Sequence, residues 1–139
     1  MAAFPTRSDP AWKAWPPRLA LLLLCSAYLQ GGWIKAVDFG AAVAEMAHFG
    51  LAPAAPLAAA TIALELGASV MVITGLWRWL GALALAGFTL MATFLANRFW
   101  EASGAERFAL ENAFFEHLGL VGAFVLVAWH DLFKRPHDD

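Results

Sequence analysis

A single ionisable side chain, Glu65, lies near the centre of a long apolar stretch, residues 57–76. A helix of this length spans about 30 Å, the thickness of the hydrocarbon core of a bilayer. A carboxylate near the midplane costs at least ~2.5 kcal/mol against an apolar residue, so we expect Glu65 to face protein or a water-filled cavity. We predict that Glu65 is functional, as a proton acceptor. The alternative is a protonated Glu65 that hydrogen-bonds to a neighbouring helix and serves packing.

Further polar side chains fall where they would line a pocket around Glu65. Thr61 precedes Glu65 by one helical turn and therefore shares its helix face. Lys35, near the end of the first apolar stretch, either snorkels to the headgroups or forms an ion pair with Glu65. The ligand-binding residues that we predict, Lys35 and Thr61 included, are Gln30, Lys35, Thr61, Asn97, Asn112, Glu116 and His117.

Two kinds of ligand are considered for this pocket. A metal site is not predicted, because no His-x-x-x-His spacing occurs on any one helix. A quinone is the alternative, since its carbonyl groups suit His, Asn or acid partners beside apolar walls.

The composition is that of a polytopic membrane protein. Of the 139 residues, 61% are hydrophobic and 14% are charged, whereas a soluble domain carries about 25% charged residues. The net charge of −2, with no basic patch, argues against nucleic-acid binding. Cys25 is the single cysteine, which excludes an intramolecular disulfide and a dithiol relay within this chain.

Four apolar stretches predict an all-α fold, an integral membrane bundle of four transmembrane helices. The predicted spans are residues 18–37, 56–76, 79–100 and 111–129. Residues 38–50 are too short and polar to span, and their apolar residues recur at helical spacing, which predicts an amphipathic interfacial helix between the first two spans. The other predicted segments are a cytoplasmic lead-in (1–17), a charged loop (101–110) and a cytoplasmic tail (131–139), around one membrane domain (18–130).

The distribution of basic residues predicts the orientation of the bundle. With the N-terminus inside, the inner segments hold six Lys and Arg residues and the outer segments hold three. This bias favours both termini in the cytoplasm. All seven tryptophans fall at or just outside span ends, as an aromatic belt requires. The outer half of the bundle then collects most of the polar side chains, which predicts an outward-facing polar pocket around Glu65.

Short segments at the span ends, taken in order, resemble the DoxX family of small four-helix bacterial membrane proteins. They are Gly31-Gly32-Trp33-Ile34-Lys35, His48-Phe49-Gly50-Leu51, Glu65-Leu66-Gly67-Ala68, Gly75-Leu76-Trp77-Arg78 and His117-Leu118-Gly119-Leu120. The chain departs from the family at Glu116-His117, where Lys-Asn is usual. The resemblance implies a location in the bacterial inner membrane. It also implies kinship with the small subunit of thiosulfate:quinone oxidoreductase, or with members that accompany redox or metal-stress proteins.

These observations favour an accessory or quinone-facing subunit of a membrane oxidoreductase assembly. In this interpretation Glu65 accepts a proton, Lys35 tunes its charge, and Glu116 and His117 contact the ligand. The alternatives are a non-catalytic subunit or assembly factor and, third, a small proton-coupled carrier. The expected partners are the lipid bilayer, other membrane or periplasmic proteins, or a second copy of the chain. A stand-alone enzyme is not expected, because no nucleophile, metal set or cofactor fingerprint stands out.

Overall fold

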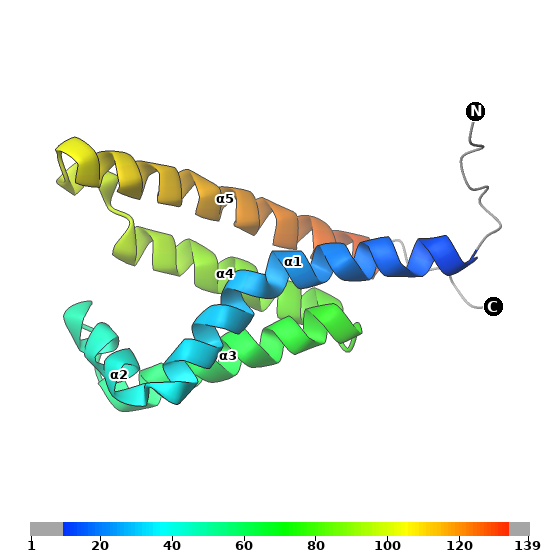
Figure 1. Cartoon of the computed structure of the whole chain (residues 1–139), viewed down its shortest axis with the longest axis horizontal. Coiled ribbons are helices and arrows are strands. Elements are labelled where there is room, and N and C mark those ends of the chain that lie inside the picture. Colours follow the sequence, from blue (N-terminus) through cyan, green and yellow to red (C-terminus); the bar gives the residue numbers. More distant parts are fainter. Residues whose placement is uncertain (1–9, 134–139) are drawn as a thin grey trace.

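The computed structural model describes residues 10–133, with side chains described from residue 16 onward, and every regular element in this part of the chain is a helix (Figure 1). The elements, in order, are α1 (Pro10–Val37), α2 (Phe39–His48), α3 (Ala54–Thr74), α4 (Arg78–Ala96), the short 3-10 helix η1 (Phe99–Glu101) and α5 (Gly104–Phe133). The predicted all-α fold, with a short helix between the first two long ones, is confirmed.

Four of these helices are long and apolar enough to cross a membrane. They cover Pro16–Val37, Ala54–Thr74, Arg78–Glu101 and Gly104–Phe133. The many large apolar side chains that remain exposed on them, such as Leu126 and Trp33, would contact lipid rather than water. The chain is a multi-pass membrane protein, and the predicted number of spans is confirmed.

The first helix begins earlier than predicted. It starts at Pro10, so residues 10–17 of the predicted lead-in are helical. Pro16 and Pro17 lie inside α1. Proline has a helical φ, and the helix continues through this pair although neither residue supplies an N–H donor. Residues 1–9 of the lead-in lie outside the described residues.

The last helix is longer at both ends than predicted. Residues 104–110, predicted as loop, form the first two turns of α5, and the helix continues to Phe133. Most of these first residues are good helix formers, and Glu106 lies in the first turn, where the helix dipole favours an acidic side chain. Charge alone was therefore a poor signal for a loop. Of the predicted tail, 131–133 is helical and 134–139 lies outside the described residues.

The third span, Arg78–Glu101, is not one continuous α-helix. Helix α4 stops at Ala96, and Asn97 forms its C-cap, with the backbone N–H of Asn97 bonded to the carbonyl of Thr93. The chain then enters η1. At the other end of α4, Gly75 (φ 87°) and Trp77 (φ 46°) adopt left-handed backbone conformations that make the tight turn from α3.

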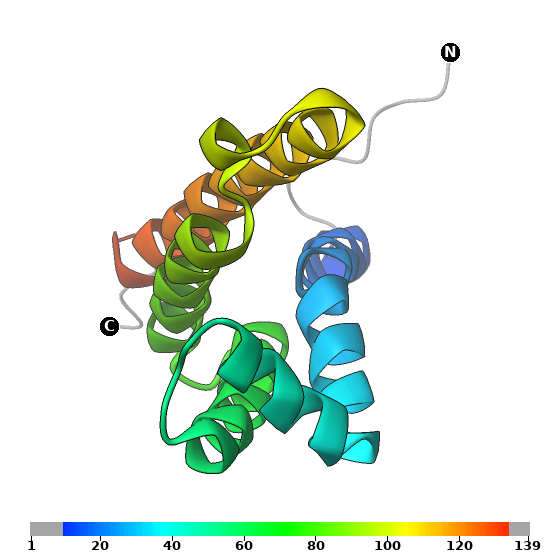
Figure 2. The same ribbon diagram turned by 90° about the vertical axis from the view of Figure 1, so that its left-hand side faces the viewer.

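The helices pack side by side in the order α1, α3, α4, α5, and the two outer members do not close into a ring. Figure 2 looks at the end that carries α2 and shows α1 standing apart from α5, with α3 and α4 between them. Helix α2 lies across the ends of α1 and α3, with Ala42 and Met46 buried against Ala58. The start of α1 and the end of α5 lie at the opposite end of the bundle (Figure 1).

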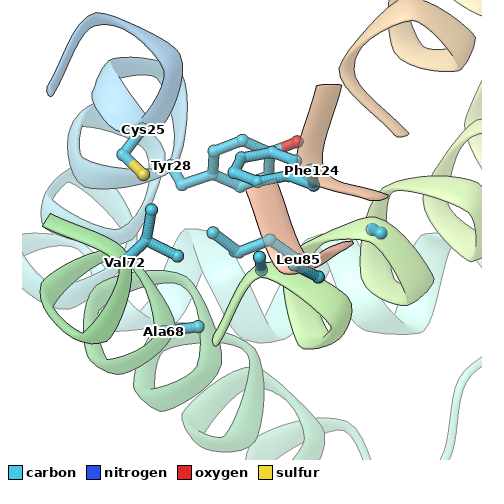
Figure 3. Close-up of a cluster of buried hydrophobic side chains, with 9 residues drawn as sticks. Cys25, Tyr28, Ala68, Val72, Leu85 and Phe124 are labelled. Carbon is cyan, nitrogen blue, oxygen red and sulfur yellow. The ribbon is translucent and has the colours of Figure 1, made fainter. Parts of the chain in front are cut away.

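The middle of the bundle is filled by a compact apolar core that draws side chains from all four spans. Figure 3 shows Tyr28 of α1 and Phe124 of α5 above Val72 of α3 and Leu85 of α4. The rings of Tyr28 and Phe124 meet edge to face, with 5.5 Å between centroids. This contact joins the two outer helices at mid-height.

Candidate functional site

An ion pair between Lys35 and Glu65 links α1 to α3. Lys35 Nζ donates to Glu65 Oε1 at 2.9 Å. The side chain of Lys35 is 18% exposed and that of Glu65 is 5% exposed. Of the two roles considered for Lys35, the ion pair is confirmed. Because the pair is largely withdrawn from solvent, its charges attract more strongly than a surface pair would.

The second carboxylate oxygen of Glu65 has no hydrogen-bond partner. Glu65 Oε2 is fully buried, and no donor among the described residues reaches it. It faces Gly31 on α1, where an added Cβ would lie 3.2 Å away. The nearest part of α1 therefore offers neither a side chain nor a donor. A buried carboxylate oxygen without a partner is unfavourable and accepts a donor from any ligand that reaches it.

A cavity of about 260 Å³ lies beside the ion pair. All four long helices and α2 contribute to its lining, which includes Tyr28, Lys35, Glu45, Glu65 and His117. Apart from Thr89, its remaining walls are apolar, with Phe88 and Leu120 among them. A few polar groups on apolar walls are the usual make-up of a small-molecule site.

His117 enters the cavity from α5 and is oriented by Asn97 of α4. Asn97 Nδ2 lies 3.0 Å from His117 Nδ1 and also donates to Thr93 Oγ1 at 3.1 Å. With the amide nitrogen toward the ring, Nδ1 is the acceptor, so the neutral imidazole carries its proton on Nε2. Asn97 is buried. In this tautomer His117, which lines the cavity, has an N–H donor that Asn97 does not use.

Tyr28 and Thr89 form the polar part of the cavity floor. The hydroxyl groups of the two residues are hydrogen-bonded to each other, and Thr89 Oγ1 also donates to the carbonyl of Leu85 at 2.7 Å. Both residues are buried and both line the cavity. Tyr28 also belongs to the apolar core, so the cavity borders that core at this point.

Comparison with known proteins identifies the family of this chain. Residues 19–98 match the family model DoxX, which is more than half of the sequence. The chain belongs to the DoxX family. The matched stretch covers most of α1 and all of α2, α3 and α4, while α5 lies outside it. No curated protein and no solved structure matches the chain.

The DoxX match includes part of the candidate site. Lys35, Glu65 and Asn97 lie within the matched residues, and His117 lies beyond them. The cavity of this DoxX protein is therefore completed by a helix that the family model does not cover.

The predicted ligand-binding residues divide into three groups in the DoxX fold. Lys35 and His117 line the polar cavity, and Asn97 stands directly behind His117. Thr61 lines a neighbouring apolar cavity and donates its hydroxyl to the carbonyl of Leu57 at 2.9 Å. The residues that are exposed and line neither cavity are Gln30, Asn112 and Glu116.

Helix phase explains why some predicted residues face away from the site. Glu116 and His117 are neighbours in sequence and point about 100° apart on α5. Only His117 faces α4, so the acidic residue beside it remains exposed. Gln30 precedes Gly31 on α1 and is rotated away from the cavity in the same manner. The spacing of the polar residues predicted their height along the bundle axis but not the direction in which each side chain points.

Sequence reasoning missed Tyr28 as a cavity residue and Asp131 as a buried group, and it counted Glu45 among the polar residues of the outer half without naming it as a ligand-binding residue. Tyr28 is the single tyrosine and lies two turns before Lys35 on α1, which is a usable signal. Asp131 was assigned to the tail, yet it is buried and its Oδ2 accepts the backbone N–H of Trp79 at 3.1 Å. It stabilises the first turn of α4, at the end of the bundle opposite the cavity.

Metal binding gains no support from the described residues. Glu45 and His48 have a Glu-x-x-His spacing on α2, which is found in some metal sites. No third His, Cys, Asp or Glu joins them to form a group that could hold a metal within residues 10–133. The donor set around Glu65, one carboxylate paired with an ammonium group, also suits a hydrogen-bonding organic ligand better than a cation.

Proposed function

We propose that this DoxX protein is an inner-membrane accessory or quinone-facing subunit of an oxidoreductase assembly, and that its ligand binds in the cavity beside Glu65. The observation that supports this is the buried, unpartnered Glu65 Oε2 at a cavity that His117 and Lys35 also line. A hydrogen-bonding headgroup would satisfy that oxygen, and the apolar walls suit a hydrophobic ring.

A quinone fits the distribution of donors in this cavity. Its carbonyl oxygens accept hydrogen bonds, and Lys35 Nζ and His117 Nε2 supply donors from two different helices. The hydroxyl of the reduced form, a quinol, is a donor and suits Glu65 Oε2. The site thus offers partners for both redox forms, which is what a quinone-facing subunit needs.

Reduction of a quinone to a quinol takes up a pair of electrons and a pair of protons, one proton on each oxygen. In the proposed assembly the electrons come from a redox partner protein. The protons come from water on the outer side, one by way of Glu65 and the other by way of the imidazole of His117. Glu65 is thus the proton acceptor of the site, and Lys35 stabilises its charged form between transfers.

The proposed orientation places the cavity toward the periplasm, with both termini in the cytoplasm. It rests on the six basic residues of the inner segments against three on the outer side. The cavity lies at the end of the bundle that carries α2, away from the start of α1 and the end of α5. A periplasmic redox partner would reach it from that side.

A non-catalytic role in assembly is the second candidate. It is favoured by the ion pair itself, because Lys35 and Glu65 tie α1 to α3 and such a link serves folding as well as chemistry. In that case the host complex would need the helix faces of this chain but not the carboxylate of Glu65.

Purification from the native membrane in a gentle detergent, with mass spectrometry of proteins and extracted lipids, tests the proposal. We expect a redox protein and a quinone to copurify with the wild type. The matched variants are Glu65→Gln and Glu101→Gln, since Glu101 is an exposed acid near the same end of the bundle. Glu65→Gln should lose the quinone and Glu101→Gln should retain it. A wild type that carries neither quinone nor redox partner would contradict the proposal.

A further inference from the structure

A second, apolar cavity adjoins the polar one. Its volume is about 90 Å³, and it lies between α2, α3 and α4. Its walls include Met46 and Phe49 from the α2 region, Thr61 from α3 and Met91 and Leu95 from α4. Thr61 uses its hydroxyl within its own helix, so it adds little polarity to this wall. The space therefore favours aliphatic or aromatic carbon over polar groups.

The two cavities meet along a shared wall. The residues that line both are Lys35, Glu45, Phe88, Ala92 and Ala96. Three of the five lie on α4, and two of those are alanines, whose small side chains add little bulk between the cavities. The polar and the apolar cavity thus adjoin each other at these residues, with Lys35 in contact with both.

The apolar cavity leads toward the lipid-facing surface of the bundle. Met91, in its wall, is 54% exposed. Helix α2 packs on α3 and α1, and its contacts with α4 are slight or absent. Few contacts therefore hold α2 against α4. We call the apolar cavity between these two helices the lateral slot.

We propose that the lateral slot admits the ligand from the bilayer and holds the first part of its apolar chain, while the headgroup lies beside Glu65. The ligand is thus an amphiphile with a compact hydrogen-bonding head and a long hydrocarbon tail. This inference rests on the proposed function and adds the tail site and the route. Because the slot is small, the remainder of the tail lies in the surrounding lipid.

The slot can be filled at Leu95, which lines the apolar cavity but not the polar one. Tryptophan at this position would occupy the slot, and Met91→Trp, at another residue that lines the apolar cavity alone, offers a second variant if the first fails to fold. The matched control is Leu83→Trp, at an exposed leucine of α4 that lines neither cavity. All variants are compared with the wild type in nanodiscs of the same lipid content, so partitioning of the tail into lipid is constant.

Binding of decylubiquinone and of its tail-free benzoquinone headgroup, measured by calorimetry, tests the route. We expect the ratio of the two affinities, tailed over tail-free, to be at least about tenfold larger in the wild type and Leu83→Trp than in Leu95→Trp, since burial of each methylene adds affinity. Leu95→Trp should keep the affinity for the headgroup. Equal ratios in the wild type, Leu95→Trp and Met91→Trp overturn the slot while the proposed function stands. No binding of either compound overturns both.

Discussion

Gly31 of α1 lies against the unpartnered carboxylate oxygen of Glu65 of α3, so closely that a Cβ at position 31 would stand 3.2 Å from Oε2. The same Cβ would lie 3.6 Å from Lys35 Nζ. The glycine thus keeps the space over the ion pair clear. Its neighbour Gly32 has a different role, because a Cβ there would lie 2.8 Å from the side chain of Leu66 and crowd the packing of α1 on α3.

Alanine at these two glycines should separate binding from stability. Gly31→Ala is expected to weaken quinone binding severalfold with little change in the free energy of unfolding, because it narrows the space at Oε2. Gly32→Ala is expected to lower the free energy of unfolding by about 1 kcal/mol, since overpacking costs about 1–3 kcal/mol and the better helix propensity of alanine offsets about 1 kcal/mol. Unfolding in mixed micelles and ligand titration measure the two effects. Equal behaviour of both variants would contradict this division.

Removal of Lys35 alone should lower the free energy of unfolding more than removal of both charges of the Lys35–Glu65 pair. Lys35→Met leaves the carboxylate of Glu65 buried without a counter-charge, which typically costs about 3–5 kcal/mol. The double variant Lys35→Met with Glu65→Gln should recover most of that loss, because no charge remains to be buried. Thermal unfolding followed by circular dichroism, in a complete double-mutant cycle, gives the coupling between the residues. Additive effects would show that the pair does not stabilise the fold.

The hydrogen bond from Asn97 to His117 should matter for ligand binding. Asn97→Ala removes the group that fixes the ring and its Nε2 proton, and the loss of one such bond corresponds to about a two- to tenfold loss of affinity. Asn112→Ala is the control, because Asn112 is exposed on α5 and lines neither cavity. Titration with decylubiquinone compares the two variants. Unchanged affinity in Asn97→Ala would show that the orientation of His117 is immaterial.

Asp131 should affect stability without affecting the ligand. Its carboxylate accepts the N–H of Trp79 in the first turn of α4, and loss of a comparable N-terminal cap costs about 0.5–2 kcal/mol. Asp131→Ala is therefore expected to lower the free energy of unfolding, and Asp131→Asn, which keeps an acceptor oxygen, to lower it less. Quinone affinity should stay at the wild-type value in both. A fall in affinity without a fall in stability would contradict this assignment.

The sequence predicted the number and type of the spans well. A run of apolar residues whose helix is as long as the bilayer is thick is stable as a transmembrane helix. The Lys35–Glu65 ion pair was one of two roles considered for Lys35, since the rise per residue places the two side chains at similar depths, and the structure shows this pair. The prediction of a loop at residues 104–110 from their charges is wrong, because the local helix propensity is high and these residues begin α5.

The composition of the site was predictable only in part. Helical spacing shows which polar residues share a face, but the rotation of each helix about its axis is set by packing with its neighbours. For this reason His117 reaches the cavity, whereas Glu116 and Asn112 are exposed. Tyr28 and Glu45 enter the site through tertiary contacts between α1, α4 and α2, which a single sequence does not encode as a pattern.

The orientation in the membrane can be tested with single cysteines. Cys25 is the native cysteine and is fully buried, so the wild type should resist a membrane-impermeant maleimide. Phe108→Cys, at an exposed site near the start of α5, is expected to react in intact spheroplasts. Leu76→Cys, at the exposed turn between α3 and α4, should react only in inverted vesicles. The opposite pattern would place the cavity on the cytoplasmic side.

Quinone binding beside Glu65 is tested most directly by calorimetric titration of the purified protein in nanodiscs with decylubiquinone, for the wild type, Glu65→Gln and Glu101→Gln. We expect saturable binding to the wild type and to Glu101→Gln. We expect at least about a tenfold weaker affinity for Glu65→Gln, because hydrogen bonds to a charged group contribute about 1.5–3 kcal/mol. Equal affinity of Glu65→Gln and the wild type, or no saturable binding to the wild type, would contradict it.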